Sequence, residues 1–264
     1  MKADWVKIDH WSDIMTNNPT VCLACLHNED DAPFMGRFLE MIKYDWITTG
    51  VAIKTDSCLT KTCPTTFDGK LQTSIHGDYG SGFDKRPKDG GFHALRARND
   101  LMRAAEDTGC DWILLADPDE LFRDETYVEI QTAHKARKTT IWFECYHFCT
   151  PDQYVWWQST TKQIHGSRRM LHDPHARAVR SSSRSRYVSN VSNQYRKRLR
   201  NYTVHCHLGP QNPRDVHIAY GIYHIHTRHM FDPKRPSQTQ LAEMDKKTAP
   251  MTLPQSYVDA FDSQ

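Results

Sequence analysis

The sequence has no uninterrupted apolar stretch that approaches the roughly 18 residues of a membrane-spanning helix. Its first ten residues alternate charged and apolar side chains, so they lack the apolar segment of a secretory signal. It also lacks internal repeats and a strong net charge, which is only +2. These absences exclude a membrane protein, a collagen and a coiled coil, and they predict a soluble, cytoplasmic chain with no membrane partner.

The sequence does contain enough apolar material for a sizeable core. Hydrophobic residues make up 38% of the 264 positions and charged residues 25%, as in a folded globular protein. Of the eight cysteines, Cys22 and Cys25 form a C-x-x-C pair inside an apolar run. Such a pair can bind zinc or act in redox chemistry, but no second C-x-x-C completes a four-thiolate site. We therefore favour buried free thiols on a strand, with the metal or redox role as the alternative.

Strand and helix patterns alternate over the first 150 residues. Short apolar runs predict strands, and apolar residues spaced three and four apart predict helices. The expected strands cover residues 20–26, 47–53, 71–75, 110–116 and 139–148; the expected helices begin at Pro33, cover 93–108, and run from an Asp124 N-cap to about residue 138. This order predicts an α/β fold with a mostly parallel central sheet and helices on both faces. Polar side chains that follow the strands should gather at one edge of that sheet.

Two aspartates follow the most apolar of these strands. Asp117 and Asp119 lie in the segment Asp117-Pro-Asp-Glu120, directly after residues 110–116. Two ionised carboxylates so close together repel each other unless a cation lies between them. Mg²⁺ or Mn²⁺ would remove that repulsion and keep open positions for phosphate oxygens. The pattern therefore predicts a divalent-metal site, and the alternative is a solvated acidic turn.

Three further motifs precede this turn in the sequence. Leu26-His-Asn-Glu29 follows the first expected strand, Thr55-Asp-Ser57 follows the second, and Ala97-Arg-Asn99 precedes the strand that ends in the two aspartates. Together, over about residues 20–150, these motifs resemble the GT-A-fold glycosyltransferases, closest to the large family 2-like group. His27 stands where that group often has arginine. The resemblance implies a nucleotide-diphospho-sugar transferase fold.

The resemblance also implies an organisation and a donor. It implies a single GT-A-like domain over residues 1–264, with 20–150 as the nucleotide-sugar-binding half and 151–264 as the basic, acceptor-facing half. The donor would be a nucleoside diphosphate sugar, expected to be a UDP-sugar. The metal would act as a Lewis acid for the departing nucleoside diphosphate. The enzyme class implied is a metal-dependent glycosyltransferase.

The same resemblance assigns roles to residues that match the motifs. Asn28, Glu29 and Asp56 would lie against the base and ribose of the donor. Arg98 would lie near the diphosphate or the sugar, where its charge would stabilise the leaving group. Asp117 would approach the ribose or the ion, and Asp119 would be the principal metal ligand.

Two histidines late in the chain are candidates to complete the metal shell. His224 and His226 occupy alternate positions, so in a strand their side chains face the same side. GT-A enzymes often supply one late histidine to the ion, and the resemblance implies that His224 or His226 does so here. The alternative is a pair of hydrogen-bonded surface histidines.

An inverting transferase also needs a base that deprotonates the acceptor hydroxyl. The family places a carboxylate after the D-x-D motif, on the acceptor side, and Asp152 and Glu144 are the candidates here. A retaining enzyme could act without such a base, and the sequence leaves the stereochemical outcome open.

Positive charge is concentrated in residues 162–200. This segment holds eleven Lys and Arg residues against one acidic residue, whereas the rest of the chain has 23 basic and 31 acidic residues. Interleaved tyrosines could stack on bases while the cations meet phosphates. We hypothesise a DNA acceptor that carries a hydroxymethylated base, as in virus-encoded DNA glycosyltransferases, which would place the chain in the host cytoplasm. The alternatives are a metal-dependent phosphoesterase and a non-enzymatic nucleic-acid-binding protein.

Overall fold

A computed structural model describes residues 18–27, 31–55, 71–76, 94–155, 158–160, 170–172, 174–189, 206–208, 213–227 and 246–248. The helices are α2 (Ala32–Ile42), α3 (Ala94–Glu106) and α4 (Thr126–Lys135), with the 3-10 turns η3 (Ser181–Ser183) and η4 (Pro213–Asp215). The strands are β1 (Val21–His27), β2 (Ile47–Lys54), β3 (Leu71–His76), β4 (Trp112–Leu115), β5 (Glu120–Phe122), β6 (Thr140–Thr150), β7 (Gln153–Val155), β8 (Gln158–Thr160), β9 (Met170–His172), β10 (Pro174–Arg180), β11 (Tyr187–Ser189), β12 (Cys206–Leu208), β13 (Val216–His226) and β14 (Lys246–Thr248). None of the described helices is long and apolar enough to cross a bilayer.

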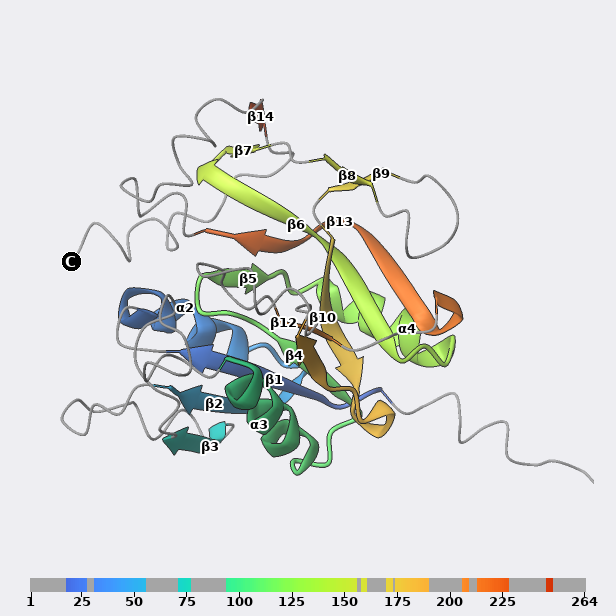
Figure 1. Ribbon diagram of the computed structural model, residues 1–264. Helices are drawn as coiled ribbons and strands as arrows, with labels where there is room; N and C mark the ends of the chain where they lie inside the picture. The colour runs from blue at the N-terminus through green and yellow to red at the C-terminus, as the bar shows by residue number, and fades with distance from the viewer. Residues whose placement is uncertain are drawn as a thin grey trace, which may run out of the picture.

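Ten of the described strands form one mixed sheet (Figure 1). β3, β2, β1 and β4 lie side by side and parallel, which confirms the parallel sheet expected for the first half. β10 then runs antiparallel between β4 and β6. β13 lies parallel to β6 and also pairs with β5. Strands from residues 151–264 thus complete the same sheet, while the expected roles of the two halves stay a prediction.

Helices cover both faces of the parallel block because β1 is apolar on both sides. Leu23 and Cys25 pack in one buried cluster with residues of α2 and α4. Cys22 and Ala24 face the other way and pack with residues of α3. The two thiols of the C-x-x-C motif therefore lie on opposite faces of the sheet, which confirms the expected buried free cysteines. Burial raises the pKa of the Cys22 thiol to about 12.

The ends of α3 and α4 differ in how well the sequence predicts them. Gly109, which follows α3, has a φ of 75°, a left-handed conformation that favours glycine and ends the helix as expected. The N-cap predicted at Asp124 is wrong, because Glu125 occupies that position and makes no side-chain capping bond. The Asp124 carboxylate instead accepts a 2.6 Å hydrogen bond from the Trp46 indole, which holds it away from the helix.

Candidate functional site

The candidate site lies in the turn that joins β4 to β5. The turn is closed at both ends by Glu120, whose backbone N–H donates to the Asp117 carbonyl at 2.9 Å. The Glu120 carboxylate in return accepts the Asp117 backbone N–H at 2.9 Å. Because β4 is parallel to β1 and β2, this turn lies at the carboxyl ends of the parallel strands, where ligands bind in open α/β sheets.

Asp119 and His226 form the centre of the site. β5 pairs antiparallel with β13, and their register sets His226 opposite Glu120. The His226 Nε2 and Asp119 Oδ2 atoms lie 3.3 Å apart, and both side chains are mostly shielded from solvent. Two residues that are far apart in the sequence thus present a carboxylate oxygen and an imidazole nitrogen to the same point.

The backbone of Asp119 is held from β13 as well. Thr227 donates both its backbone N–H, at 2.9 Å, and its hydroxyl, at 3.0 Å, to the Asp119 carbonyl. Buried Arg37, on α2, donates to the Thr227 hydroxyl at 2.9 Å. These bonds fix the position of Asp119, so its carboxylate does not depend on a mobile turn for its orientation.

Two arginines lie against Asp117. The Arg177 guanidinium, on β10, is 3.2 Å from Asp117 Oδ2 and also donates to the Glu120 carboxylate. Arg98, on α3, lies 3.7 Å from Asp117 Oδ1, and its guanidinium covers the Tyr187 ring at 5.2 Å. Both oxygens of Asp117 therefore face guanidinium groups. Cations of the protein itself thus balance part of the Asp117 charge, and its expected contact with the ribose or the ion stays a prediction.

Glu120 and His224 form a second, fully buried pair. His224 Nε2 lies 3.1 Å from Glu120 Oε1, and the imidazole stacks on Phe122 with ring centroids 4.8 Å apart. Burial acts to raise the pKa of the Glu120 carboxyl, but Arg177 and His224 outweigh it and hold that pKa well below its usual range. Burial lowers the pKa of His224 to about 4, although Glu120 opposes the shift. Of the two candidate histidines, the structure places His226, and not His224, beside Asp119.

The Asp119–His226 pair fits a divalent cation. Two neighbouring ligands around an octahedral ion with bonds of about 2.1 Å lie roughly 3.0 Å apart. The 3.3 Å between Asp119 Oδ2 and His226 Nε2 is close to that spacing. One carboxylate and one imidazole would leave several coordination positions for phosphate oxygens and water, as expected for Mn²⁺ or Mg²⁺ in a nucleotide site.

Arg98 is the donor-binding candidate that the structure places at this edge, since its side chain lies beside Asp117. Asn28, Glu29 and Asp56 lie outside the described residues, so their expected contacts with base and ribose stay predictions. Asn99, the neighbour of Arg98, has a structural role: its side chain exchanges two hydrogen bonds with the Tyr187 backbone, at 2.8 and 3.1 Å.

The two candidate bases lie in different surroundings. The Glu144 carboxylate accepts bonds from the Gly221 backbone N–H at 2.9 Å and the Tyr146 hydroxyl at 3.2 Å. Glu144 and Cys145 are neighbours on β6, so Glu144 points away from the face that carries Cys145 and His147, here called the histidine-lined face. His147 of that face lies against His226, so the orientation of Glu144 argues against a role beside Asp119. Asp152 is exposed in the turn after β6 and accepts a 2.7 Å bond from the Thr150 hydroxyl.

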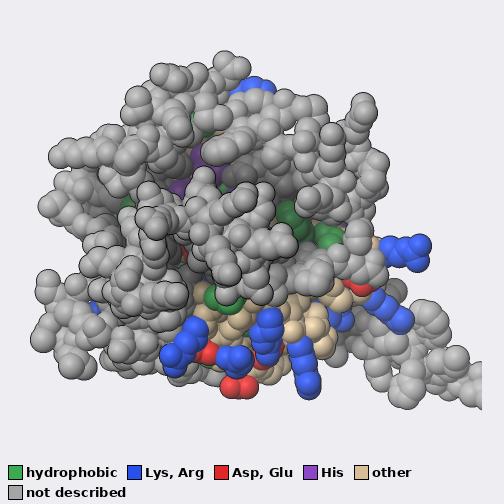
Figure 2. Space-filling view, viewed as in Figure 1, with side chains coloured by type: hydrophobic (Ala, Val, Ile, Leu, Met, Phe, Trp, Pro, Cys, Tyr) green, Lys and Arg blue, Asp and Glu red, His purple; other side chains and the backbone are tan. Residues whose placement is uncertain are grey.

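The described part of the basic segment is less exposed than expected. Arg177 is buried in the sheet, and Arg186 makes a two-bond ion pair with Glu106. Arg180 donates to two backbone carbonyls and covers the Trp112 ring. These three arginines stabilise the fold, which corrects the expectation that the whole of residues 162–200 forms a cationic surface. In the view of Figure 2, most of the visible Lys and Arg side chains gather along the lower edge of the molecule, and histidine side chains are visible farther up.

Sequence reasoning missed three residues on the histidine-lined face. Cys145 and His147 alternate on β6, and His175 lies on the neighbouring β10. Their ligand atoms lie within 4.8 Å of one another. The alternating Cys-x-His pattern within an expected strand was the available signal, but only the pairing of β10 with β6 could add His175.

Comparisons with known proteins give a distant likeness. No protein-family model and no curated protein match this chain. The structure of TarS residues 1–349 from S. aureus is 11% identical with a TM-score of 0.38, over 62% of this chain and 47% of that one. This chain thus spans about half of the TarS chain. A putative glucose-1-phosphate thymidylyltransferase from Bacillus anthracis, in complex with a sucrose, is 11% identical with a TM-score of 0.34, over 86% of this chain and 79% of that one. Likenesses at these TM-scores carry no argument for this chain.

Proposed function

We propose that this chain is a metal-dependent glycosyltransferase with a GT-A-like fold, which moves a sugar from a nucleoside diphosphate sugar to an acceptor hydroxyl. The observation that carries the proposal is the Asp119–His226 pair, 3.3 Å apart at the carboxyl ends of the parallel strands. When bound there, Mn²⁺ or Mg²⁺ would act as a Lewis acid on the diphosphate leaving group. A UDP-sugar is the proposed donor.

The protein's own charges suit the departure of a diphosphate. Arg98 is about one-fifth exposed, so its guanidinium can approach a bound ligand while it remains near Asp117. Arg177 is buried and holds Asp117 and Glu120 in place from β10. In our proposal Arg98 stabilises the negative charge that develops on the leaving group, and Arg177 positions the turn that carries Asp119. Asp152 stays our proposed base for the acceptor hydroxyl.

The phosphoesterase alternative needs more carboxylate ligands than the described neighbours of Asp119 offer. A two-metal site holds its ions about 3.5–4 Å apart and needs several carboxylates or histidines for each. Glu120 is already paired with Arg177 and His224, and Asp117 is paired with both arginines. One ion at Asp119 and His226 is therefore the arrangement that these contacts favour.

The proposal predicts that a nucleoside diphosphate protects the protein from heat only when Mn²⁺ is present. At a ligand concentration about 100 times Kd, the melting temperature should rise by roughly 5–10 °C. Asp119→Asn should abolish the rise, because the ion loses its carboxylate. Differential scanning fluorimetry with UDP, GDP and dTDP, each with Mn²⁺ or EDTA, measures this effect.

The matched control is Asp107→Asn, which changes an exposed aspartate that follows α3, at the other end of the strands. It should keep the full protection. Protection that persists in EDTA, or in Asp119→Asn, would contradict the metal site. Cleavage of a phosphoester without any sugar donor would favour the phosphoesterase instead.

For the acceptor we propose a polyanion, with hydroxymethylated DNA as the specific candidate. The support is the charge of residues 162–200, seven of whose basic residues lie outside the described part of the chain: Lys162, Arg168, Arg169, Arg196, Lys197, Arg198 and Arg200. A single diphosphate needs fewer cations than these.

A further inference from the structure

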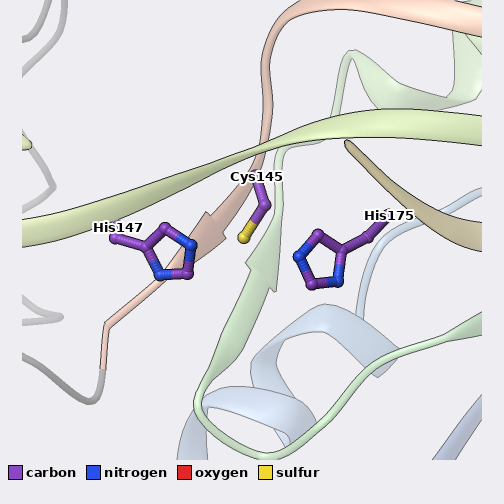
Figure 3. A group of neighbouring side chains, drawn as sticks. All are labelled: Cys145, His147 and His175. Atoms are coloured by element: carbon purple, nitrogen blue, oxygen red, sulfur yellow. The ribbon is translucent and has the colours of Figure 1, made fainter. Parts of the chain in front are cut away.

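A cysteine and two histidines point toward one another beside the proposed donor site (Figure 3). Cys145 and His147 lie two residues apart on β6, so both side chains project from one face. His175 reaches the same point from β10, which pairs with β6 in antiparallel register. All three residues lie on strands of the central sheet, and rigid elements of this kind hold a ligand set in place.

The spacing of these atoms suits a tetrahedral ion. Zinc bonds of about 2.3 Å to sulfur and 2.0–2.1 Å to nitrogen set neighbouring ligand atoms roughly 3.3–3.6 Å apart. The Cys145 and histidine ligand atoms all lie within 4.8 Å of one another. To reach the spacing of zinc ligands, the ligand atoms would need to move by about 1 Å, which small rotations of the side chains can supply.

The chemistry of the ligand set selects the kind of ion. A thiolate with two imidazoles is a soft-to-borderline set that suits Zn²⁺, whereas Mg²⁺ and Mn²⁺ prefer oxygen ligands. Burial disfavours a charged thiolate at Cys145, so binding to the ion would be what stabilises that form. The buried Cys145 side chain is also shielded from solvent oxidants.

A buried nitrogen next to the cluster lacks a partner. Within the described residues, His224 Nδ1 has no hydrogen bond, although the ring is fully buried. The centroids of the His224 and His175 rings lie 5.7 Å apart. A buried polar atom without a partner is destabilising, so an ion at the cluster with this nitrogen as a ligand would remove the penalty.

We propose that Cys145, His147 and His175 bind one Zn²⁺ ion, with the fourth position filled by His224 or by water. The ion would link β6 to β10 and so position Arg177, which lies two residues after His175 and bonds to Asp117 and Glu120. This zinc site shares no proposed ligand with the Asp119–His226 pair, although the His147 and His226 ring centroids lie only 5.1 Å apart. It does not depend on the proposed glycosyl transfer. It would be a positioning site, not a catalytic one.

The first test is the metal content of the full-length protein, purified without a histidine tag and without added metal chelators. Mass spectrometry of the bound metals should find about one Zn²⁺ per chain. Replacement by Co²⁺ should give the near-ultraviolet thiolate-to-cobalt charge-transfer band together with the visible bands of tetrahedral cobalt. Removal of the zinc by a chelator should lower the melting temperature by roughly 5–15 °C.

Matched variants locate the ion. Cys145→Ser and His147→Asn should lose the zinc, and Cys145→Ser should also lose the charge-transfer band. Cys149→Ser changes another cysteine of β6, and Asp119→Asn changes the proposed donor site; both should keep the zinc and the band. Circular dichroism of each variant checks that it is folded.

Three results would overturn the proposal. One is a folded wild-type protein that contains no zinc and shows no thiolate band when titrated with Co²⁺. Another is a zinc content that Cys145→Ser leaves unchanged. The third is Cu²⁺ in place of zinc, with an intense visible thiolate band, because a thiolate and two imidazoles also form copper sites. Loss of nucleotide protection in Asp119→Asn with zinc retained would leave this proposal intact.

Discussion

The role of Arg177 in the fold differs from the one that its sequence context suggests. In the sequence it is one of eleven cations in a basic segment, whereas in the fold it is buried and bonded to Asp117 and Glu120. A buried ion pair is costly to break because the remaining charge has no counter-ion in a medium that solvates it poorly. Its replacement should therefore affect stability more than solubility.

We expect Arg177→Met to destabilise the protein by about 3–5 kcal/mol, since Glu120 would be left as an uncompensated buried carboxylate. Arg177→Lys should recover part of this loss by keeping the charge. Arg96→Met, which removes an exposed arginine of α3, should change stability by no more than about 0.5 kcal/mol. Urea denaturation followed by circular dichroism measures all three; equal effects of the two Met variants would refute the burial argument.

His224 predicts a stability that falls as the solution becomes acidic. Its pKa is about 4 in the fold and 6.5 in the unfolded chain. Below pH 6.5 the unfolded chain therefore binds a proton that the folded protein does not, so the free energy of unfolding decreases until the pH reaches about 4. The stability that this imidazole contributes is fully present above pH 6.5.

Measurement of the urea midpoint from pH 7.5 to 4, in metal-free buffer, should show this decrease. His224→Asn should flatten the pH dependence between pH 6.5 and 4, because the titrating group is gone. Curves for the two proteins that run parallel over this interval would show that another group causes the decrease. The Asn side chain does not titrate in this range, so any pH dependence that remains in the variant comes from other groups.

At the scale of secondary structure, elements with their own hydrophobic pattern could be predicted. β1, β2 and β4 were visible as apolar runs, and α2 and α3 as periodic faces, because each buries its apolar side chains locally. β5 and β10 were not visible: β5 has three residues, and β10 carries His175 and Arg177 toward the site instead of an apolar pattern. Their positions depend on partners elsewhere in the chain, which no local pattern encodes.

Two glycines in different elements predict opposite effects of the same change. Gly36 lies exposed within α2 with nothing within 4 Å of an added Cβ, so Gly36→Ala should stabilise by about 0.5–1 kcal/mol. Gly109 has a φ of 75°, so Gly109→Ala should destabilise by about 1–2 kcal/mol. Thermal denaturation of the two variants compares them directly, and a shift of the same sign in both would contradict the helix-end assignment.

At the scale of the molecule, the site is assembled from remote segments. The family resemblance predicted Asp119 and a late histidine as metal ligands, which stays a prediction. The fold brings His226 beside Asp119 because β13 pairs with β5. The sequence could not identify the pairing of Asp117 with Arg177, or the meeting of Cys145 with His175. Those contacts depend on β10 crossing the sheet between β4 and β6, which is a property of the topology.

The distribution of charge over the whole chain predicts salt-dependent binding to DNA. The logarithm of the binding constant should fall linearly with the logarithm of salt concentration, and Arg196→Ala with Arg198→Ala should reduce that slope by about 2. The control pair Lys43→Ala and Lys135→Ala removes two exposed cations outside residues 162–200 and should leave the slope unchanged. Fluorescence anisotropy measures the slopes; binding that ignores salt would refute a DNA acceptor.

The insertion of β10 between β4 and β6 has a consequence for how the chain folds during synthesis. When residue 150 leaves the ribosome, β4 and β6 have both been made, but the strand that separates them has not. Each then exposes an unpaired edge of backbone N–H and C=O groups until residues 174–180 arrive. A nascent chain at this stage is open to wrong pairing, either of β4 with β6 or with a neighbouring chain. β10 thus completes the sheet between β4 and β6, and in a fragment that stops at residue 150 the strand β6 would lack its pairing with β10.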